Sequence, residues 1–173
     1  FTLTADVDEP EMYYLTFDGN TTNKYITFFA DKGTITITDD VSKFGINPII
    51  KGSKNQDLLN NYTKIARRYN NKNLDLIQKK FLAQKANNKD SVEIINKQHE
   101  NLLRRRYMVT VNFALNNKDN HIAPYIALTE LVNANVKWLD TINNSLSSDV
   151  KNSIYGKKLN KFIADIKKSE AKK

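Results

Sequence analysis

The 173-residue chain contains no cysteine, so its residues offer no disulfide, no thiolate nucleophile and no cysteine-based zinc site. This absence does not identify the compartment, because a cysteine-free domain is stable in either redox environment. Glycine and proline are also scarce, with five and three residues respectively. The sequence shows no glycine-rich loop of the kind that binds phosphates, and no Walker-type or dinucleotide-binding pattern.

Long apolar runs are missing as well, since no stretch approaches the roughly 20 apolar residues that a membrane-spanning helix requires. The hydrophobic content of 40%, with eight Phe and eight Tyr residues, nevertheless excludes a disordered chain. The sequence opens inside a strand pattern at residues 1–4. We therefore expect that preceding residues were cleaved, removed in cloning or disordered, and the lack of a targeting segment does not indicate the cytoplasm.

Charge divides the chain into two parts. Residues 1–50 hold three lysines and eight acids, a net charge of −5, whereas residues 51–173 hold 24 basic and 11 acidic residues, a net charge of +13. The overall charge of +8 invites a nucleic-acid-binding interpretation. The basic residues are dispersed, however, and heavy use of both Asn and Lys is typical of AT-rich genomes. Weak nucleic-acid binding is therefore kept only as a second alternative.

Apolar and polar residues alternate in the first part, as they do in half-buried strands. Residues 34–38 give the clearest strand, with Ile35 and Ile37 on one side and three threonines on the other. Residues 25–29 are the expected hairpin partner of that strand, through a turn that ends at Gly33. Further strands are expected at residues 1–7, 12–17 and 46–50. The spacing predicts an antiparallel sheet, part of a sandwich that lacks one or two strands.

Apolar residues recur at helical spacing after Gly52, and Ser53 is the expected N-cap of the first helix. The patterns predict helices over residues 58–69, 74–81, 92–113, 125–132, 136–146 and 159–166. Asn70 and Asn71 are expected to separate the first two helices. The second and third helices are expected to join across residues 87–90 into one long rod. Pro124 stands where a first-turn proline is favourable.

These patterns together predict an α+β fold. An antiparallel β module occupies residues 1–52, and an all-helical region of five or six helices at residues 53–173 packs on it. Six aromatic residues crowd the expected strands: Tyr13, Tyr14, Phe17, Tyr25, Phe28 and Phe29. Because neighbouring strand residues face opposite sides, these rings occupy both faces of the sheet. We expect one face to enter the core and the helices to cover the other, an exposed face being a sign of an interaction surface.

No residue pattern predicts a catalytic, cofactor-binding or metal site. Arg104, Arg105 and Arg106 form the densest charge cluster, but consecutive helical residues point about 100° apart, which favours a solvated flank over an anion-binding clamp. His99 and His121 have no cysteine or paired carboxylate near them in the sequence, so core or capping roles are expected for both.

Two further groups of residues carry side chains of the types found in active sites. Glu93 and Glu100 lie seven residues apart and can share a helix face, and we expect both to be solvated rather than an acid–base pair. Ser53, Ser147 and Ser148 are expected to cap helices, because no activating base accompanies them. We expect the chain to be no enzyme and to bind no cofactor.

Four stretches resemble a known family. Residues 1–10 place the acidic corner Asp8-Glu9-Pro10 before an apolar strand. Residues 28–37 hold an aromatic strand, the Gly33 turn and an alternating strand, and residues 51–55 form a Gly-Ser junction before a helix. Residues 149–159 lead into the terminal helix. In this order they resemble the N-terminal domain of unknown function that precedes AhpC/TSA-type thioredoxin-like domains in envelope thiol–disulfide oxidoreductases of certain Gram-negative bacteria.

The resemblance implies that a thioredoxin-like domain with a Cys-x-x-Cys dithiol follows about where this chain ends, since none lies within it. It further implies a non-catalytic accessory domain on the periplasmic or outer face of the envelope. Such a domain would position or dimerise the thioredoxin-like domain or recruit a client protein to it, and a lipid anchor could precede Phe1. The alternative is a stand-alone envelope lipoprotein that binds a peptide or a small apolar ligand.

Overall fold

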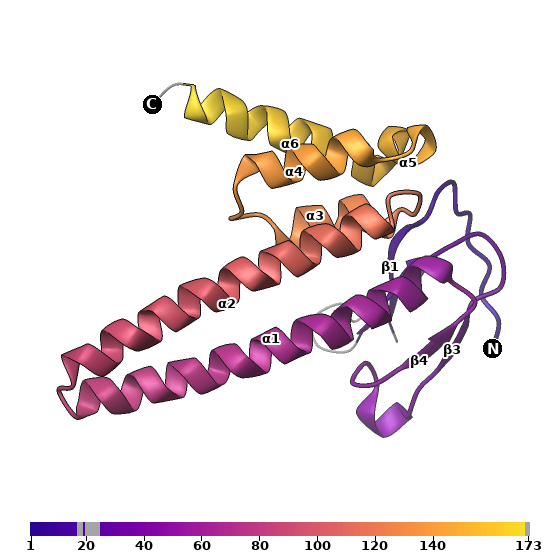
Figure 1. Ribbon diagram of the computed structural model, residues 1–173. Coiled ribbons are helices and arrows are strands. Elements are labelled where there is room, and N and C mark those ends of the chain that lie inside the picture. Colours follow the sequence, from indigo (N-terminus) through magenta and orange to yellow (C-terminus); the bar gives the residue numbers. More distant parts are fainter. Residues whose placement is uncertain (17–18, 20–24, 172–173) are drawn as a thin grey trace.

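The computed structural model describes residues 1–16, 19 and 25–171 (Figure 1). The α+β class predicted from the sequence is confirmed. The strands are β1 (Glu11–Thr16), β2 (Tyr25–Ala30), β3 (Thr36–Thr38) and β4 (Ile49–Lys51), with a 3-10 turn at Val41–Lys43. The helices are α1 (Lys54–Lys85), α2 (Lys89–Asn116), α3 (Ile122–Glu130), α4 (Val136–Ser145), α5 (Ser148–Asn152) and α6 (Ile154–Glu170). The last strand ends and the first helix begins on either side of Gly52 and Ser53.

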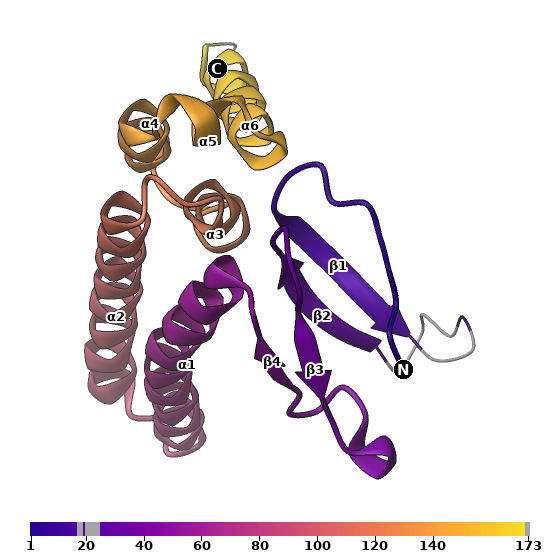
Figure 2. The same ribbon diagram turned by 90° about the vertical axis from the view of Figure 1, so that its right-hand side faces the viewer.

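The four strands form two antiparallel pairs, β1 with β2 and β3 with β4 (Figure 2). Tyr13 lies opposite Phe28 in the first pair and Ile37 opposite Ile50 in the second. The predicted hairpin between residues 25–29 and 34–38 is therefore wrong. The chain leaves β2 through Asp31, whose carboxylate binds the start of α1 instead of closing a tight turn onto β3.

The strand predicted at residues 1–7 is also wrong. Residues 1–6 are exposed and belong to no strand, so their alternating pattern has no core face to cover. The strand predicted at residues 12–17 corresponds to β1, and Phe17 lies outside the described residues. Tyr13 Oη of β1 donates a hydrogen bond to the Asp6 carbonyl oxygen, at 3.1 Å.

Helices α1 and α2 form a long antiparallel hairpin that projects from the rest of the molecule (Figure 1). Asn70 and Asn71 do not interrupt α1, because both are exposed while the residues that face α2 continue uninterrupted, and helix propensity is only a weak constraint. The predicted rod through residues 87–90 is likewise wrong. Asn87 adopts a left-handed conformation with φ 52°, and Asn88 caps α2 by accepting a hydrogen bond from Ser91 N at 3.0 Å, so the chain reverses there.

Helices α3 and α4 pack against the base of this hairpin, α6 packs on α3 and α4, and α5 packs on α6 (Figures 1 and 2). Pro124 lies in the first turn of α3, as predicted, whereas Val132 lies beyond the end of that helix and is exposed. The main core joins α2 to α3, α4, α5 and α6. Its buried residues are Val111, Ala114, Ala123, Ala127, Leu131, Leu139, Ile142, Leu146, Val150, Leu159 and Ile163.

A second core joins the sheets to the helices around Phe29, which is fully buried. Its ring lies 5.6 Å from that of Tyr125 and 5.9 Å from that of Tyr155, and it packs with Tyr62 and the α3 residues Ile122 and Ile126. The prediction that the helical region packs on the sheet is thus confirmed. Phe28, on the opposite face of β2, is only half-buried and pairs with Tyr13.

Polar side chains at the start of α1 tie the two parts together. Asn55 Nδ2 donates to Asp31 Oδ1 at 2.8 Å, and Asn55 Oδ1 accepts from the backbone N of Ile122 at 2.9 Å. Gln56 Oε1 accepts from the backbone N of Phe29 at 2.7 Å. Asn55 and Gln56 are buried, and we call this group of bonds the junction network. It connects β2, α1 and α3 at one point.

The first strand and the last helix are also linked, although they lie about as far apart in sequence as the chain permits. Met12 N donates to Tyr155 Oη at 3.0 Å, and Ile154 N donates to Glu9 Oε2 at 2.8 Å. The Glu9 carboxylate thereby binds one of the free N–H groups at the start of α6, where the helix dipole favours a negative charge.

We predict that Phe29→Ala lowers the free energy of unfolding by about 3–5 kcal/mol, because a fully buried ring is lost from the second core. Phe28→Ala should cost less, about 1–2 kcal/mol, because that ring is already partly hydrated. Thermal denaturation followed by circular dichroism measures both. The parent chain should melt in one transition, since the junction network and Phe29 couple the sheets to the helices. Two separated transitions, or equal costs for the two variants, would contradict this coupling.

Candidate functional site

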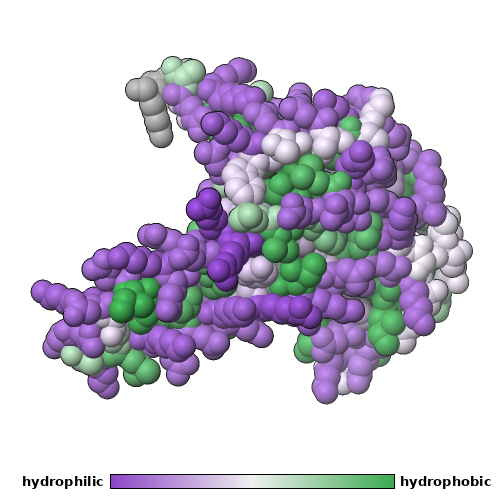
Figure 3. All heavy atoms as spheres, viewed as in Figure 1, coloured by the Kyte–Doolittle hydropathy of each residue, from purple (hydrophilic) through white to green (hydrophobic). Residues whose placement is uncertain are grey.

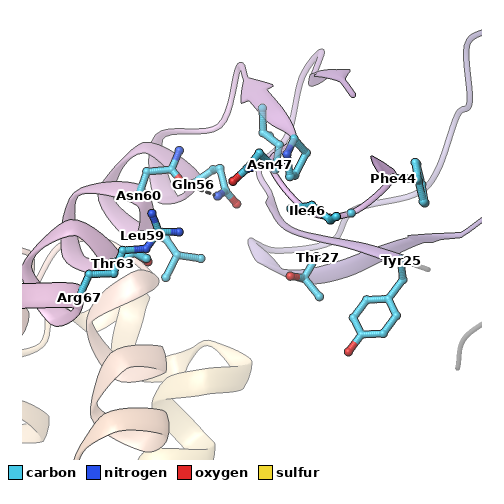
Figure 4. Close-up of a pocket in the computed structure, with 13 residues that line it drawn as sticks. Tyr25, Thr27, Phe44, Ile46, Asn47, Gln56, Leu59, Asn60, Thr63 and Arg67 are labelled. Atoms are coloured by element: carbon cyan, nitrogen blue, oxygen red, sulfur yellow. Dashed lines mark hydrogen bonds between the residues drawn. The ribbon is translucent and has the colours of Figure 1, made fainter. Parts of the chain in front are cut away.

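A groove of about 620 Å³ lies between the sheet region and α1 (Figure 4). One wall is α1, and the other is formed by β2, the loop that precedes β4, and β4 itself. The lining residues are Tyr25, Thr27, Phe44, Gly45, Ile46, Asn47, Pro48, Ile50, Gln56, Leu59, Asn60, Thr63 and Arg67. We call this cavity the sheet–helix groove.

The α1 wall of the sheet–helix groove is mostly polar and the facing wall is mostly apolar. Gln56, Asn60, Thr63 and Arg67 are spaced by four, three and four residues, so they form one stripe along α1. Gln56 is fixed by the junction network and donates through Nε2 to Asn60 Oδ1 at 2.9 Å. This arrangement offers amide and hydroxyl groups opposite an apolar surface and a cation at one end, which suits a short peptide or a small apolar anion.

A smaller pocket of about 220 Å³ shares Arg67 and Thr63 with the groove and lies between α1, α2 and α3. Arg106 and Glu130 form an ion pair in it, with Arg106 Nη2 at 2.5 Å from Glu130 Oε2. Within the described part of the chain, the buried Arg106 Nε has no hydrogen-bond partner. Tyr62 closes the pocket floor and shares a hydrogen bond of 3.0 Å with Thr110 Oγ1.

Three tyrosines around this region have pKa values above their ordinary one. Burial is the main cause in each case. It raises the pKa of Tyr62 from 10.0 to about 12, and the hydrogen bond with Thr110 opposes the shift only in part. Burial also raises the pKa of Tyr125 and that of Tyr155, each reinforced by the negative charge that its neighbours would carry. These hydroxyls therefore act as neutral hydrogen-bonding groups at physiological pH.

The distal half of the α1–α2 hairpin, residues 70–103, forms a surface of a different kind. We call it the arm. Its two helices pack against each other, and several large apolar side chains on it are exposed: Leu74, Ile77, Phe81, Leu82, Ile94 and Leu103. Figure 3 shows hydrophobic side chains gathered toward the tip of the arm, between hydrophilic ones. Such a concentration away from the core is typical of an interaction surface.

The sheet aromatics are divided between buried and exposed positions. Tyr14 and Tyr25 are exposed and pack edge to face, with ring centroids 5.7 Å apart. They stand on the same face of the sheet as Phe29 but remain exposed, and Tyr25 lines the groove next to α1. Burial under the helices, which we expected for this face, is thus found at Phe29 and not at its far end.

The arginine cluster does not behave as one group. Arg104 and Arg105 are exposed, as expected of a solvated flank, whereas Arg106 turns inward to Glu130. Hairpin packing brings Arg67 of α1 to the same pocket as Arg106. Sequence patterns do not reveal this proximity of Arg67 and Arg106, because the two residues lie on two helices whose relative register is set by the turn at residues 86–88.

The two histidines and the two glutamates considered from the sequence lie at exposed or half-buried positions. His99 is exposed, so the core role expected for it is wrong, and His121 precedes α3 without a side-chain capping bond. Glu93 pairs with Lys97 at 2.8 Å across one helical turn, and Glu100 is exposed. Ser53 caps α1 as predicted, accepting from Gln56 N at 3.0 Å.

Ser147 stands at the cap position of α5 without a side-chain bond to that helix. Among the described residues, no group of three or more His, Cys, Asp or Glu side chains is placed to hold a metal ion. In the same part of the chain, no helix combines the length and the apolar character that crossing a membrane requires.

Sequence reasoning missed both the groove stripe and the arm surface. The stripe from Gln56 to Arg67 reads as a solvated helix face, because polar residues at helical spacing usually are one. Helical spacing predicts a separate helix at residues 74–81, which includes Leu74, Ile77 and Phe81. The sequence signal that could have identified the exposed stripe is its position: Leu74, Ile77 and Phe81 each follow, by one residue, a position that faces α2.

We predict that the contribution of Tyr62 to the free energy of unfolding is constant below about pH 10 and falls between about pH 10 and 12. In that window the unfolded chain ionises its tyrosines while the folded state keeps Tyr62, whose pKa is about 12, protonated. Tyr62→Phe should flatten this decline relative to the parent. The melting temperature of both proteins, measured against pH, tests the assignment, and equal declines would refute it.

In a comparison with known families, the family described as "Domain of unknown function (DUF4369)" matches residues 1–59. Comparisons with the curated proteins and with the solved structures found no match. The expectation of a domain of unknown function is confirmed over residues 1–59, and the match bears neither on residues 149–159 nor on neighbouring domains. The chain thus joins a DUF4369-like segment, which holds both sheets and the first six residues of α1, to helices beyond that segment.

Proposed function

We propose that this chain is a non-catalytic interaction domain of an envelope thiol–disulfide oxidoreductase-like protein. Its role is to position or dimerise a thioredoxin-like domain, or to recruit a client protein to it. The association with a thioredoxin-like domain and the envelope location rest on the family resemblance of the four sequence stretches. The non-catalytic role is supported by the lack of cysteine, because dithiol exchange requires a thiolate.

The observation that carries the interaction role is the arm. A globular domain normally covers its large apolar side chains, and here Leu74, Ile77 and Phe81 are more than half exposed on a helix that extends beyond both cores. Building this surface requires a helix of 32 residues, about 48 Å long, of which only the first half contacts the sheets and α3. A protein partner that covers the arm would remove these apolar side chains from water.

We predict that the complete reading frame encodes a Cys-x-x-Cys thioredoxin-like domain after Lys173 and a lipoprotein-type signal before Phe1. Sequencing the gene in its genomic context reads both directly. A stop codon just beyond Lys173 would remove the oxidoreductase association and favour the alternative below.

We also predict that this chain by itself does not catalyse disulfide exchange. In an insulin-reduction assay with dithiothreitol, the purified chain should leave the rate at that of the buffer, while a thioredoxin measured alongside accelerates it. Acceleration by the purified chain would overturn the non-catalytic role.

The alternative, a stand-alone envelope lipoprotein that binds a peptide or a small apolar ligand, is favoured by one observation, the sheet–helix groove. Its walls combine an apolar surface with Arg67 at one end, so an apolar anion is its most suitable small ligand. The exposed Thr27 side chain projects from β2 into the groove between the two walls (Figure 4). A large side chain there fills the groove without disturbing a core.

If the groove is a ligand site, the apolar anion 1-anilinonaphthalene-8-sulfonate should bind to the parent chain and lose at least about tenfold in affinity in Thr27→Trp. Thr36→Trp is the matched control, because Thr36 is an exposed strand threonine outside the groove. Fluorescence titration gives both affinities. Equal affinities for the two variants would exclude the groove as the site.

A further inference from the structure

The backbone of β2 has a free edge on the side away from β1. Phe29 N donates to Gln56 Oε1 at 2.7 Å, so this N–H group points away from β1. Its register partner Met12 also directs its N–H outward, to Tyr155 Oη at 3.0 Å. Met12 and Phe29 are therefore a non-hydrogen-bonded pair of the antiparallel ladder, in which both residues turn their backbone groups outward.

The same orientation recurs at Thr27. Bonded and non-bonded pairs alternate along an antiparallel ladder, so the pair of Tyr14 with Thr27 is of the same kind as that of Met12 with Phe29. The N–H and C=O groups of Thr27 thus point outward, on the edge where Gln56 meets Phe29. Among the described residues, neither group has a hydrogen-bond partner. An unpaired strand edge of this kind is a template for another extended backbone.

This free edge opens into the sheet–helix groove and is short. At Phe29 it is closed by the Gln56 amide, which accepts the bond that a neighbouring strand would accept. At Tyr25 it is closed by Gly45, where φ is 85° and a Cβ atom would lie 2.7 Å from the Tyr25 carbonyl oxygen. Tyr25, Gly45 and Gln56 all line the groove. The distance along β2 from Tyr25 to Phe29 is about 13 Å, which suits a segment of about four residues.

The α1 wall is suited to the outer edge of such a segment. A peptide paired with β2 carries a second row of N–H and C=O groups on its other side. Asn60 and Thr63 lie across the groove from Thr27 (Figure 4). Asn60 Oδ1 accepts from Gln56, and in the described part of the chain Asn60 Nδ2 donates to no other residue. Gln56 and Asn60 are separated by about 6 Å along α1, close to the repeat of about 6.7 Å along one edge of a strand.

The remaining lining residues define the kind of peptide. Ile46, Pro48 and Ile50 form an apolar wall, which suits the aliphatic side chains that an extended peptide presents at every second residue. Among the described lining residues, Arg67 carries the only charge. The groove therefore favours a neutral or acidic peptide over a basic one.

We propose that the sheet–helix groove binds a short, extended, neutral or acidic peptide as an added strand on β2. One residue of an antiparallel peptide exchanges both backbone hydrogen bonds with Thr27. Asn60 and Thr63 bond the other edge of the peptide, and its aliphatic side chains pack on the apolar wall. This mode of binding rests on the ligand-binding function proposed for the groove and names the class of ligand.

Amide hydrogen exchange, followed by NMR on the isotopically labelled chain, tests the free edge. Ile26 and Phe28 belong to the bonded pairs of the ladder, and Phe29 N bonds to Gln56. In the free chain these three amides should exchange at least about tenfold more slowly than that of Thr27. A Thr27 amide as protected as that of Phe28 would refute the free edge.

Two peptide mixtures then test the pairing. The first contains acetylated tetrapeptide amides built from Val, Thr and Asp in all orders. The second is identical but methylated at every backbone nitrogen, so it keeps the side chains and cannot donate backbone bonds. At millimolar concentration the first mixture should slow exchange at Thr27 at least about fivefold, and the second should not. Equal effects of the two mixtures, or no effect of either, would overturn the strand pairing.

Tyr14 is the internal control for the mixtures. Its N–H has the same outward orientation on the free edge of β1, outside the groove, so its exchange should not change. Protection of Tyr14 equal to that of Thr27 would show pairing with any strand edge and would refute the groove as the site.

A pair of variants at one residue provides the second readout. Thr27→Pro removes the outward N–H and leaves the ladder bonds of Ile26 and Phe28, as proline does on an edge strand. Thr27→Val keeps that N–H and is the matched control. Fluorescence anisotropy with the first mixture, labelled with fluorescein, should show at least about tenfold weaker binding to Thr27→Pro and an unchanged affinity for Thr27→Val. Equal affinities would overturn the pairing, and if circular dichroism shows that Thr27→Pro is unfolded, the methylated mixture decides.

Titration with 1-anilinonaphthalene-8-sulfonate separates the two levels of the proposal. If this anion binds in the groove while the tetrapeptides leave Thr27 unprotected, the groove remains a small-ligand site and the strand pairing is refuted. If neither the anion nor the tetrapeptides bind, the ligand-binding function of the groove fails with it. Protection of Thr27 by the first mixture alone supports the strand pairing whether or not the anion binds.

Discussion

The fold depends on the burial of two amides, those of Asn55 and Gln56, where the sheets meet the helices. A buried polar group without a hydrogen bond costs about 1–3 kcal/mol, so each of these side chains can be placed there only if its partners are placed too. Those partners are the backbone N of Phe29, the carboxylate of Asp31 and the backbone N of Ile122. Satisfying them fixes the end of β2, the start of α1 and the start of α3 at once, and with them both walls of the groove.

This dependence gives physical meaning to the extent of the family match. The matched residues 1–59 include Phe29, Asp31, Asn55 and Gln56, but most of the side chains in the core around Phe29 come from later in the chain. Tyr125 and Tyr155 lie against its ring, and Ile122 N completes the bonds of Asn55. The DUF4369-like segment in this protein is thus one side of a shared core, and its surface toward α3 and α6 is an internal surface.

The sequence predicted the features that depend only on the residues of one helix or one strand. Alternation and helical spacing identified the α+β class, the capping by Ser53, and the helices that contain Pro124 and Val136. It did not predict which strands pair, because Asp31 acts through Asn55, a residue 24 positions away. Nor did it predict the candidate sites. Periodicity shows which residues share a face of a helix or strand. Whether that face is buried, as at Phe29, or exposed, as at Phe81, depends on residues distant in the sequence that pack against it or do not.

Helix α1 runs without a break from the junction network, past the groove, to the tip of the arm. Its fixed end is held by Asn55 and Gln56, and its free end lies about 48 Å away, so the helix is a lever. A rotation of about 5° at the fixed end, small enough for side chains to absorb, displaces the tip by about 4 Å over that length. Gln56 and Asn60 stand near the pivot and also line the groove. The geometry therefore converts a small adjustment of the groove wall into a displacement the size of a side chain where the arm presents Leu74, Ile77 and Phe81.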